Sequence, residues 1–379
     1  MNNLTKKTAF KNSLPVLFFK KNIVMCVAFV AAAITCFIVP PDKEYLGYFD
    51  WKTLASLFCV NAAVCGLMNI SFFYKLAKNV IKTAKNARMS ILILIYITFI
   101  SSMFIANDTA LLTFLPLAVI MFKTTKKEKY MAFTFIMQNI AANLGGMLTP
   151  FGNPKNLYLY EKFSIPTGEF MGIMSVPFFI SVGLITLCCI IFVKPEPMEM
   201  DNEDTLVDPV KTVVYFMLFV LAIIIVFKVI PYWIGVVIIT GILLIMDRKA
   251  LRMVDYPMLF TFFFFFIFAE NMSRIDVIRD GLSMLLDKNT LVVSALSCQV
   301  MSSVPASILL SQFTMNYKAL LVGVNIGSVG SIISSMASLI TVSEYVKHNP
   351  GKMGYYIKKF SLFNFTFLGI LILIMVFIV

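Results

Sequence analysis

Long apolar runs separated by short charged loops dominate this chain. A helical membrane span needs about 20 apolar residues, whereas a transmembrane strand alternates apolar and polar positions. Runs such as 91–100 and 259–268 are apolar throughout and therefore favour helices. The predicted apolar segments are approximately 22–39, 53–74, 89–122, 130–160, 170–193, 211–229, 232–247, 256–270, 290–314, 319–342 and 358–379.

Composition narrows the class of protein. The 379 residues are 59% hydrophobic and 14% charged, and the mean hydropathy is +0.87. These values exclude an ordinary soluble globule and predict a multi-pass helical protein of the cell membrane. A single histidine, His348, leaves almost no material for histidine chemistry, and the seven cysteines are interpreted as packing residues. The chain therefore does not resemble a membrane enzyme.

The net charge of +12 reflects topology rather than nucleic-acid binding. Lysine and arginine gather in particular loops, as the positive-inside rule predicts. The N-terminus and the loops 75–88 and 123–129 are basic, so we expect all three in the cytoplasm. Counting spans from there places the C-terminus outside.

The segment 89–122 lies between two loops predicted on the same side, so it crosses twice or not at all. Its centre carries Asn107, Asp108 and Thr109. A buried acid costs about 2.5–3.5 kcal/mol on insertion scales, so such a group usually serves an ion, a proton or a substrate. A re-entrant hairpin with its polar tip inside the protein explains this pattern; two full spans are the alternative.

A second interruption falls in the segment 130–160, at Thr149 and at Gly152-Asn153-Pro154-Lys155-Asn156. Glycine and proline in mid-membrane leave backbone groups without helical partners. Such backbone is tolerated only where protein buries it or where it lines a polar cavity. We therefore predict an unwound helix here.

The remaining chain predicts a second unit of the same kind. The acidic, proline-containing stretch 194–210 reads as a solvated linker between a first repeat, 1–193, and a second repeat, 211–379. Residues 271–288 predict an interfacial amphipathic helix. A hairpin at 290–314, with Ser302 and Ser303 at its tip, precedes an unwound helix at 319–342.

A weak internal repeat supports this division. With one gap, the alignment pairs Asn139 with Asn325, Gly145 with Gly330, Gly152 with Ala337, and Asn153 with Ser338. The loop charges give corresponding elements opposite directions. The sequence thus predicts an all-α polytopic membrane protein with two inverted-topology repeats, each with a re-entrant hairpin and an unwound transmembrane helix.

The polar residues at the two interruptions indicate which kinds of ion they suit. Half-helix N-termini favour an anionic group, and freed carbonyls with Asn and Thr oxygens suit a hard cation such as sodium. Asp108 is a candidate for completing a cation shell or carrying a proton. Lys155 has two open interpretations, an anion-attracting group or a lysine paired with a carboxylate. We expect no cofactor other than a coupling sodium ion or proton.

At these residues the chain resembles the ion transporter superfamily, which includes divalent anion:sodium symporters, citrate transporters and arsenite permeases. The stretch 106–116 is similar to the first hairpin motif, and 145–156 is similar to the unwound-helix motif. The second half matches more loosely. Ala106-Asn107-Asp108 stands where the symporters carry Ser-Asn-Thr. The added acid, Asp108, is more similar to the arsenite-permease and antiporter branches.

The resemblance implies a homodimer in which a moving domain shuttles against a scaffold by an elevator motion. It implies a sodium or proton site at Asn107, Asp108, Gly152 and Asn153, and a second site near Ser303, Ala337 and Ser338. The function expected from the residues and the resemblance is secondary active transport of a small inorganic or organic anion. A sodium:proton antiporter using Asp108 is the alternative, and a channel or a membrane enzyme is more remote.

Overall fold

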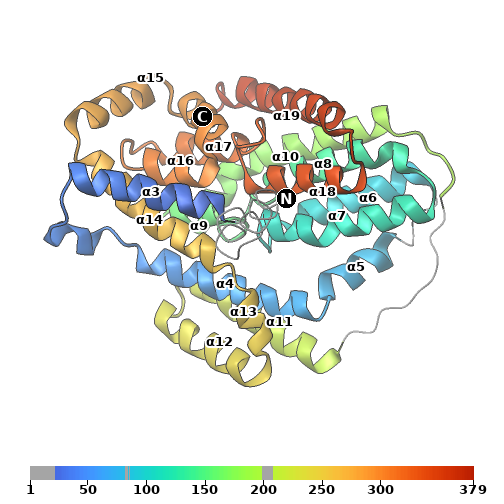
Figure 1. The fold of residues 1–379 in the computed structure, drawn as a ribbon, viewed down its shortest axis with the longest axis horizontal. Coiled ribbons are helices and arrows are strands. Elements are labelled where there is room, and N and C mark those ends of the chain that lie inside the picture. Colours follow the sequence, from blue (N-terminus) through green and yellow to red (C-terminus); the bar gives the residue numbers. More distant parts are fainter. Residues whose placement is uncertain (1–21, 82–83, 85, 199–207) are drawn as a thin grey trace, which may run out of the picture.

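The protein is an assembly of helices joined by short loops (Figure 1). The computed structural model describes residues 22–81, 84, 86–198 and 208–379. Within these ranges no β-strand forms, and Asn86 and Pro197 make an isolated antiparallel bridge. The predicted all-α class of fold is confirmed. The basic N-terminal residues that orient the chain lie outside the described ranges.

The first half of the chain supplies eight α-helices and two 3-10 helices within the described residues. They are α3 (Ile23–Ile38), η1 (Lys43–Gly47), α4 (Trp51–Asn69), α5 (Phe72–Ile81), α6 (Ala87–Ser101), α7 (Asn107–Thr124), η2 (Glu128–Tyr130), α8 (Met131–Gly145), α9 (Pro154–Lys162) and α10 (Thr167–Phe192).

The second half, as far as it is described, is built from nine further α-helices. They are α11 (Pro209–Val226), α12 (Tyr232–Met246), α13 (Arg248–Met253), α14 (Tyr256–Ser273), α15 (Asp276–Met301), α16 (Ser303–Leu310), α17 (Tyr317–Ile326), α18 (Met336–His348) and α19 (Met353–Met375).

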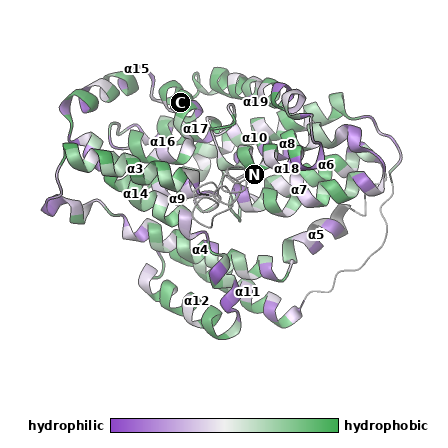
Figure 2. Cartoon of the chain, in the orientation of Figure 1, coloured by the Kyte–Doolittle hydropathy of each residue, from purple (hydrophilic) through white to green (hydrophobic). Residues whose placement is uncertain are grey.

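Five of the described helical segments are long and apolar enough to cross a membrane. They are Lys43–Asn69, Thr167–Phe192, Pro209–Val226, Tyr256–Ser273 and Met353–Met375. Figure 2 shows apolar residues along most helix bodies and hydrophilic residues mainly at helix ends and in loops. The shorter apolar helices among the described residues lie in α3, α6, α12 and α17.

Two groups of helices can be distinguished by their packing. In one group, α4 packs against α11, α12 and α13, and α3 packs along α14. In the other group, α8 contacts α6, α7 and α18, while α17 contacts α15 and α16 (Figure 1). The two groups meet where α4 contacts α9 and where α14 contacts α15 and α16, and α5 contacts α4 of the first group and α6 and α7 of the second.

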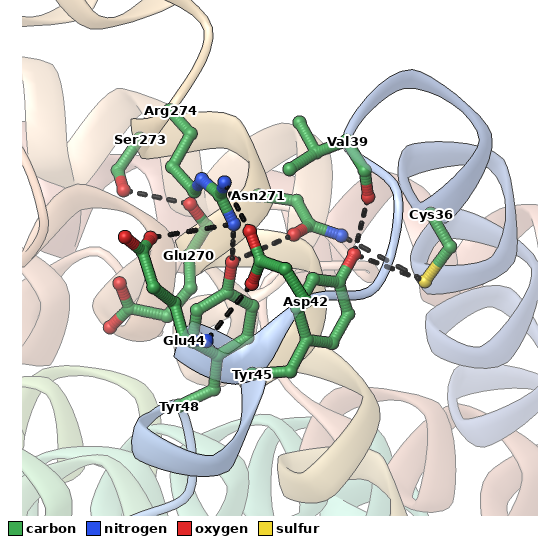
Figure 3. Close-up of polar contacts among 10 residues, drawn as sticks. All are labelled: Cys36, Val39, Asp42, Glu44, Tyr45, Tyr48, Glu270, Asn271, Ser273 and Arg274. Carbon is green, nitrogen blue, oxygen red and sulfur yellow. Dashed lines mark hydrogen bonds and ion pairs between the residues drawn. The ribbon is translucent and has the colours of Figure 1, made fainter.

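The ion pairs agree with the predicted placement of the loops on the two sides of the membrane. Counting alternate crossings from the cytoplasmic loops puts both partners of each long-range ion pair among the described residues on one side: Lys127 and Lys129 with Glu196, Lys228 with Glu161, Arg274 with Asp42 and Glu44, and Lys318 with Glu169. Arg274, for example, follows α14 and donates to Asp42 before α4 at 2.6 Å (Figure 3). This hydrogen bond holds the pKa of Asp42 below its usual range. The contacts therefore support the predicted alternation of loops between two sides.

Arg274 also anchors a wider polar cluster at this rim. Its guanidinium donates to the hydroxyl of Tyr48 at 2.8 Å, and that hydroxyl donates to the side-chain oxygen of Asn271 at 3.2 Å. Asn271 in turn donates to Thr35 of α3 at 3.2 Å (Figure 3 shows most of these groups). The cluster fixes the loop between α3 and α4 to the end of α14.

Part of the start of the predicted linker contacts the first half of the chain. Met198 is buried, and the backbone N–H of Ala87 donates to the carbonyl of Glu196 at 2.8 Å. The Glu196 carboxylate accepts hydrogen bonds from Lys127, Lys129 and Tyr130. Lys194, Pro195 and Pro197 are exposed, and the role of 194–210 as a linker between two repeats stays a prediction.

The sequence predicts an amphipathic helix over 271–288, whereas α14 extends to Ser273 and residues 276–288 form the first part of α15. Asn289 has extended backbone, φ −165° and ψ 93°, so α15 is two helices joined by a kink. The Asn289 side chain accepts from the N–H of Val292 at 2.9 Å and so begins the second part. The kink separates the amphipathic part from the apolar part that begins at 290, and the re-entrant hairpin at 290–314 stays a prediction.

Candidate functional site

The first polar interruption lies at the start of α7. A turn at 102–106 joins α6 to α7, so Asn107 and Asp108 begin the second leg rather than forming the turn itself. The Asn107 amide donates to the side-chain oxygen of Asn143 in α8 at 3.0 Å. Thr109 gives its carbonyl to the hydroxyl of Thr113 at 2.9 Å. The tip of the hairpin is thus fastened to the first broken helix.

The second interruption separates α8 from α9. The break begins at Gly146 and ends at Asn153, whose side chain caps α9 by accepting from the N–H of Asn156 at 3.0 Å. Asn and a following proline at the first helical position are a strong helix start. Gly152 belongs in this break because a Cβ there would overlap the carbonyl oxygen of Gly146.

Asn156 holds this break in shape. Its amide donates to the carbonyls of Gly146, Met147 and Thr149 at 3.1, 3.2 and 3.3 Å. These carbonyls lack helical partners because the helix is interrupted, and buried backbone groups without partners are costly. Thr149 adds a bond from its hydroxyl to the carbonyl of Met103, at 2.5 Å. Asn156 and Thr149 therefore hold the unwound backbone of the first break in position.

The second half contains a similar break between α17 and α18. It runs from Gly327 to Ser335, and Ser335 caps α18 by accepting from the N–H of Ser338 at 3.2 Å. By cap position Ser335 corresponds to Asn153 and Ser338 to Asn156, so the sequence alignment was displaced by three residues there. Ala337 is fully buried and gives its carbonyl to Thr341.

Gln299 supports this second break. Its amide donates to the carbonyls of Gly327 and Val329 at 2.8 and 3.3 Å, and its oxygen accepts from the N–H of Ser331 at 2.8 Å. Gln299 lies on α15, in the hairpin next to the break. Its polar side chain inside the apolar run 290–301 is the signal in the sequence that points to this role.

The second hairpin turns at Ser302. This residue has a positive φ of 70°, and its hydroxyl donates to the carbonyl of Ser334 at 3.3 Å. The N–H of Ser303 donates to the same carbonyl at 2.9 Å. The tip of the second hairpin and the second break are therefore in direct contact.

Asparagines connect the two breaks across the two halves of the chain. Asn325 at the end of α17 donates to the side-chain oxygen of Asn156 at 2.6 Å and accepts from Asn153 at 3.4 Å. In the matching position, Ser338 of α18 donates to the side-chain oxygen of Asn139 in α8 at 3.3 Å. All of these side chains are buried. In each half, a residue that precedes the break is therefore hydrogen-bonded to a residue that follows the break of the other half.

Two ionisable side chains, Asp108 and Lys155, lie beside this network. The Asp108 carboxyl group has the backbone of Ala337 next to it, and its Oδ1 is buried and finds no hydrogen-bond partner among the described residues. Lys155 on the first turn of α9 is 2% exposed. Its ammonium acts on Asp108 through space and donates to the hydroxyl of Ser303 at 3.3 Å. Both polar interruptions therefore meet at one place.

The candidate residues thus fall into two groups. Those that lie together around the breaks and hairpin starts are Asn107, Asp108, Thr149, Gly152, Asn153, Asn156, Ser302, Ser303, Ala337 and Ser338. Thr109 is half-buried on the next position of α7, and no side-chain bond joins it to this network in the described contacts. Sequence reasoning missed Asn143 and Gln299 as site supports.

A separate cavity of about 360 Å³ opens on the side where α9 ends. Phe49, Asp50, Trp51, Lys52, Glu161, Ser164, Lys228 and Tyr232 line it. Lys228, between α11 and α12, pairs with Glu161 of α9 at 3.2 Å across this cavity. The ion pair ties the helix that follows the first break to the α4, α11 and α12 group.

Comparison with known proteins identifies the family. A family model described as citrate transporter matches residues 15–321, which is most of the chain. The chain belongs to the citrate transporter family. It is 30% identical over 300 residues to an uncharacterized transporter of Methanocaldococcus jannaschii, covering 79% of this chain and 82% of that protein. It is 24% identical over 326 residues to the inner membrane protein YbiR of Escherichia coli, covering 83% and 85%.

Membership of this family confirms the resemblance drawn from the two motifs. The matched range contains both motifs of the first half and the second hairpin, with Asp108, Lys155 and Ser303. The chain is accordingly a multi-pass membrane transporter, and both family and relatives point away from an enzyme.

Proposed function

We propose that this protein is a secondary active transporter of a small inorganic or organic anion, citrate- or dicarboxylate-like or arsenite-like, driven by sodium ions or protons. The observation that carries the proposal is the junction of the two helix breaks, where Asn325 bonds to Asn156. Interrupted helices that meet inside a membrane protein are the usual architecture of a transport site.

The junction offers the anion two helix starts. The helices α9 and α18 both begin at a break, with Asn153 and Ser335 as their caps. Free N–H groups and the positive end of each helix dipole favour a negative group there. Oxyanions of a solute bound at the junction would accept these hydrogen bonds. Ala337 and Ser338 on α18 and Gly152 at the first break are the expected contacts.

The coupling ion is assigned to the first hairpin and first break. Asp108 has an unpartnered buried oxygen, and Asn107, Gly152 and Asn153 add side-chain and backbone oxygens nearby in the same motifs. Hard oxygen donors of this kind suit sodium, and a carboxylate alone suits a proton. The anion and the cation would neutralise one another when the site is occupied.

An elevator motion fits the two groups of helices. In this proposal α6–α9 and α15–α18 carry the solute, and α3, α4 and α11–α14 form the scaffold of a homodimer. The groups contact each other through α4 with α9, α14 with α15 and α16, and the ion pair of Lys228 with Glu161. We assign the protein to the cell membrane, with the N-terminus in the cytoplasm and the C-terminus outside.

A sodium:proton antiporter is the second candidate. The unpartnered oxygen of Asp108 favours it, because a carboxylate that alternates between a proton and a sodium ion needs an accessible lone pair. The two functions differ in whether an anion binds at all.

A thermal-shift screen of the purified protein separates these functions. Citrate, dicarboxylates and arsenite would be tested with and without sodium and at several pH values, since a ligand that binds the native state raises its stability. An anion that raises the melting temperature more in sodium, or more at low pH, supports symport. Stabilisation by sodium alone, unaffected by every anion, would favour the antiporter.

A further inference from the structure

Two polar links join the scaffold helices to the helices that carry the solute in the proposed motion. Among the side-chain hydrogen bonds and ion pairs of the described residues, one link is the 3.2 Å ion pair of Lys228 with Glu161, and the other is the 2.7 Å hydrogen bond from Gln312 to Glu270. Lys228 lies between α11 and α12 and Glu270 lies on α14, which are scaffold elements. Glu161 on α9 and Gln312 after α16 are on the carrying side.

The two links form one cluster because Glu161 and Lys162 are neighbours at the end of α9. Lys162 donates to the side-chain oxygen of Gln312 at 2.7 Å, and the side-chain nitrogen of Gln312 donates to Glu270 at 2.7 Å. Gln312 therefore continues a chain of charge-assisted hydrogen bonds from an ammonium to a carboxylate. We refer to Glu161, Lys162, Lys228, Glu270 and Gln312 as the rim cluster.

Ring contacts extend from the rim cluster to the first break. Phe151, inside the break, packs against Phe227 at the end of α11, with ring centroids 5.9 Å apart. Tyr158 of α9 packs against Phe266 of α14 at 5.6 Å. Apolar contacts are non-directional, whereas hydrogen bonds and ion pairs need their atoms in definite positions. The rim cluster, more than these rings, therefore fixes where the carrying helices lie along the scaffold.

The rim cluster also borders the cavity of about 360 Å³. Glu161 and Ser164 come from the carrying side of this cavity, and Lys52, Lys228 and Tyr232 come from the scaffold side. The Glu161 side chain is nevertheless only 6% exposed. A carboxylate that loses its partner in such a place is strongly disfavoured until water reaches it. Breaking the ion pair therefore favours separation of the two walls.

We infer that the rim cluster is a closure: it holds the carrying helices in the position seen here and has to open before the junction of the breaks can face the side where α9 ends. The loop charges assign that side to the outside. The inference rests on the proposed transport function and names the contacts that its motion has to break. The strength of the closure then sets how the protein divides between its two positions.

Distances between two spin labels test the closure without any solute. The labels would be placed at Met315→Cys and Val237→Cys, which are exposed positions on the carrying and scaffold sides, in the full chain with its native cysteines replaced. Double electron–electron resonance would be recorded in lipid nanodiscs. Lys228→Ala together with Glu270→Ala removes both links from the scaffold side. We expect this variant to increase the share of a second, longer distance.

Charge reversal separates the closure from general damage to the fold. Glu161→Lys places two ammonium groups together and should shift the distances in the same direction. Glu161→Lys combined with Lys228→Glu restores an ion pair and should return the distances to their original distribution. Asp42→Ala is the matched control, because it removes a 2.6 Å ion pair with Arg274 that lies within the scaffold. It should leave the distances unchanged.

Unchanged distances in K228A/E270A would overturn the closure, and so would an equal shift in D42A. If K228A/E270A does not fold, the charge-reversal pair decides: a shift in E161K that K228E does not reverse, or no shift at all, would overturn it. Failure to take up any anion beside shifted distances would refute the proposed function and leave the closure standing. Normal uptake beside unchanged distances would refute the closure alone.

Discussion

Asn325 and Asn156 join the two broken helices by a buried hydrogen bond of 2.6 Å. Asn325 comes from the last turn of α17, and Asn156 from the first turn of α9. Asn156 at the same time donates to three carbonyls of its own break. One side chain therefore fixes the unwound backbone of the first half and its position against the second half.

Replacing Asn156 by Asp should destabilise the protein. The carboxylate cannot donate, so three buried carbonyls lose their partner, although a carboxylate oxygen can still accept from Asn325. Each lost buried partner costs about 1–3 kcal/mol. We expect a lower melting temperature in detergent and loss of the thermal shift caused by ligand. Asn316→Asp is the matched control, because Asn316 caps α17 as an acceptor and aspartate caps equally well. Equal stability of N156D and N316D would contradict this role.

Replacing Gly152 by Ala should also disturb the site. A Cβ at Gly152 would overlap the Gly146 carbonyl, so the break has to shift. We expect ligand binding, measured by thermal shift or titration, to weaken by at least tenfold, or about 1.4 kcal/mol. Gly172→Ala in α10 meets no atom within 4 Å and should bind as the wild type does. Normal binding by G152A would show that the break adapts freely.

Glu196 predicts a pH dependence of stability. Hydrogen bonds from Lys127 first, and then from Lys129, lower its pKa from 4.5 to about 2. A carboxyl whose folded pKa is lowered stabilises the fold above its unfolded pKa and loses that contribution as the pH falls through its folded value. The stabilisation should therefore be present above pH 4.5 and decline from there towards pH 2.

The measurement is thermal unfolding of the wild type and Glu196→Gln over this pH range. The difference between their melting temperatures should be largest above pH 4.5 and shrink as the pH falls below it. Glu128→Gln removes a carboxylate from the same basic loop, outside the Glu196 cluster, and serves as the control. A difference between E196Q and the wild type that does not change with pH would argue against the cluster.

Cross-linking Glu161 to Lys228 should stop transport if the two groups of helices move against each other. These residues form a 3.2 Å ion pair between α9 and the turn that joins α11 to α12. With the native cysteines replaced, the double variant Glu161→Cys, Lys228→Cys should lose uptake on oxidation and recover it on reduction. The single cysteine variants control for chemical modification. Uptake that persists through a complete cross-link would exclude relative motion at this contact.

The sequence predicted much of this fold because membrane insertion constrains it strongly. Apolar length and loop charge were sufficient to predict helices and the alternation of loops, which the contact of Arg274 with Asp42 supports. Asn107, Asp108 and Asn153 stood out because polar groups are costly at that depth. A second site near Ser303 and Ala337 was expected from the family resemblance, whereas the repeat alignment was displaced by three residues in that part of the chain.

The rest depended on tertiary contacts that no pattern encodes. The sequence does not show that the side-chain amides of Asn156 and Gln299 donate hydrogen bonds to the carbonyls of the two breaks. Both roles depend on how the backbone unwinds. The repeat alignment paired Asn153 with Ser338 instead of Ser335 for the same reason. Glu196 appeared to belong to a solvated acidic run, because its basic partners lie about 70 residues earlier.

Asp108 is the residue on which ion coupling is expected to depend. Asp108→Asn keeps the size of the side chain but removes the charge and the proton, so we expect a folded protein that still binds anion weakly and no longer accumulates it. Asp208→Asn, at an exposed cap of α11, is the control and should accumulate anion normally. Thermal unfolding in detergent checks that both variants are folded.

The most direct measurement is uptake of labelled citrate, a dicarboxylate and arsenite into proteoliposomes under imposed sodium and pH gradients. The account predicts that at least one of these solutes is accumulated against its gradient, saturably, only while an ion gradient is present, and not by Asp108→Asn. Equilibration without accumulation, or full accumulation by D108N, would contradict it.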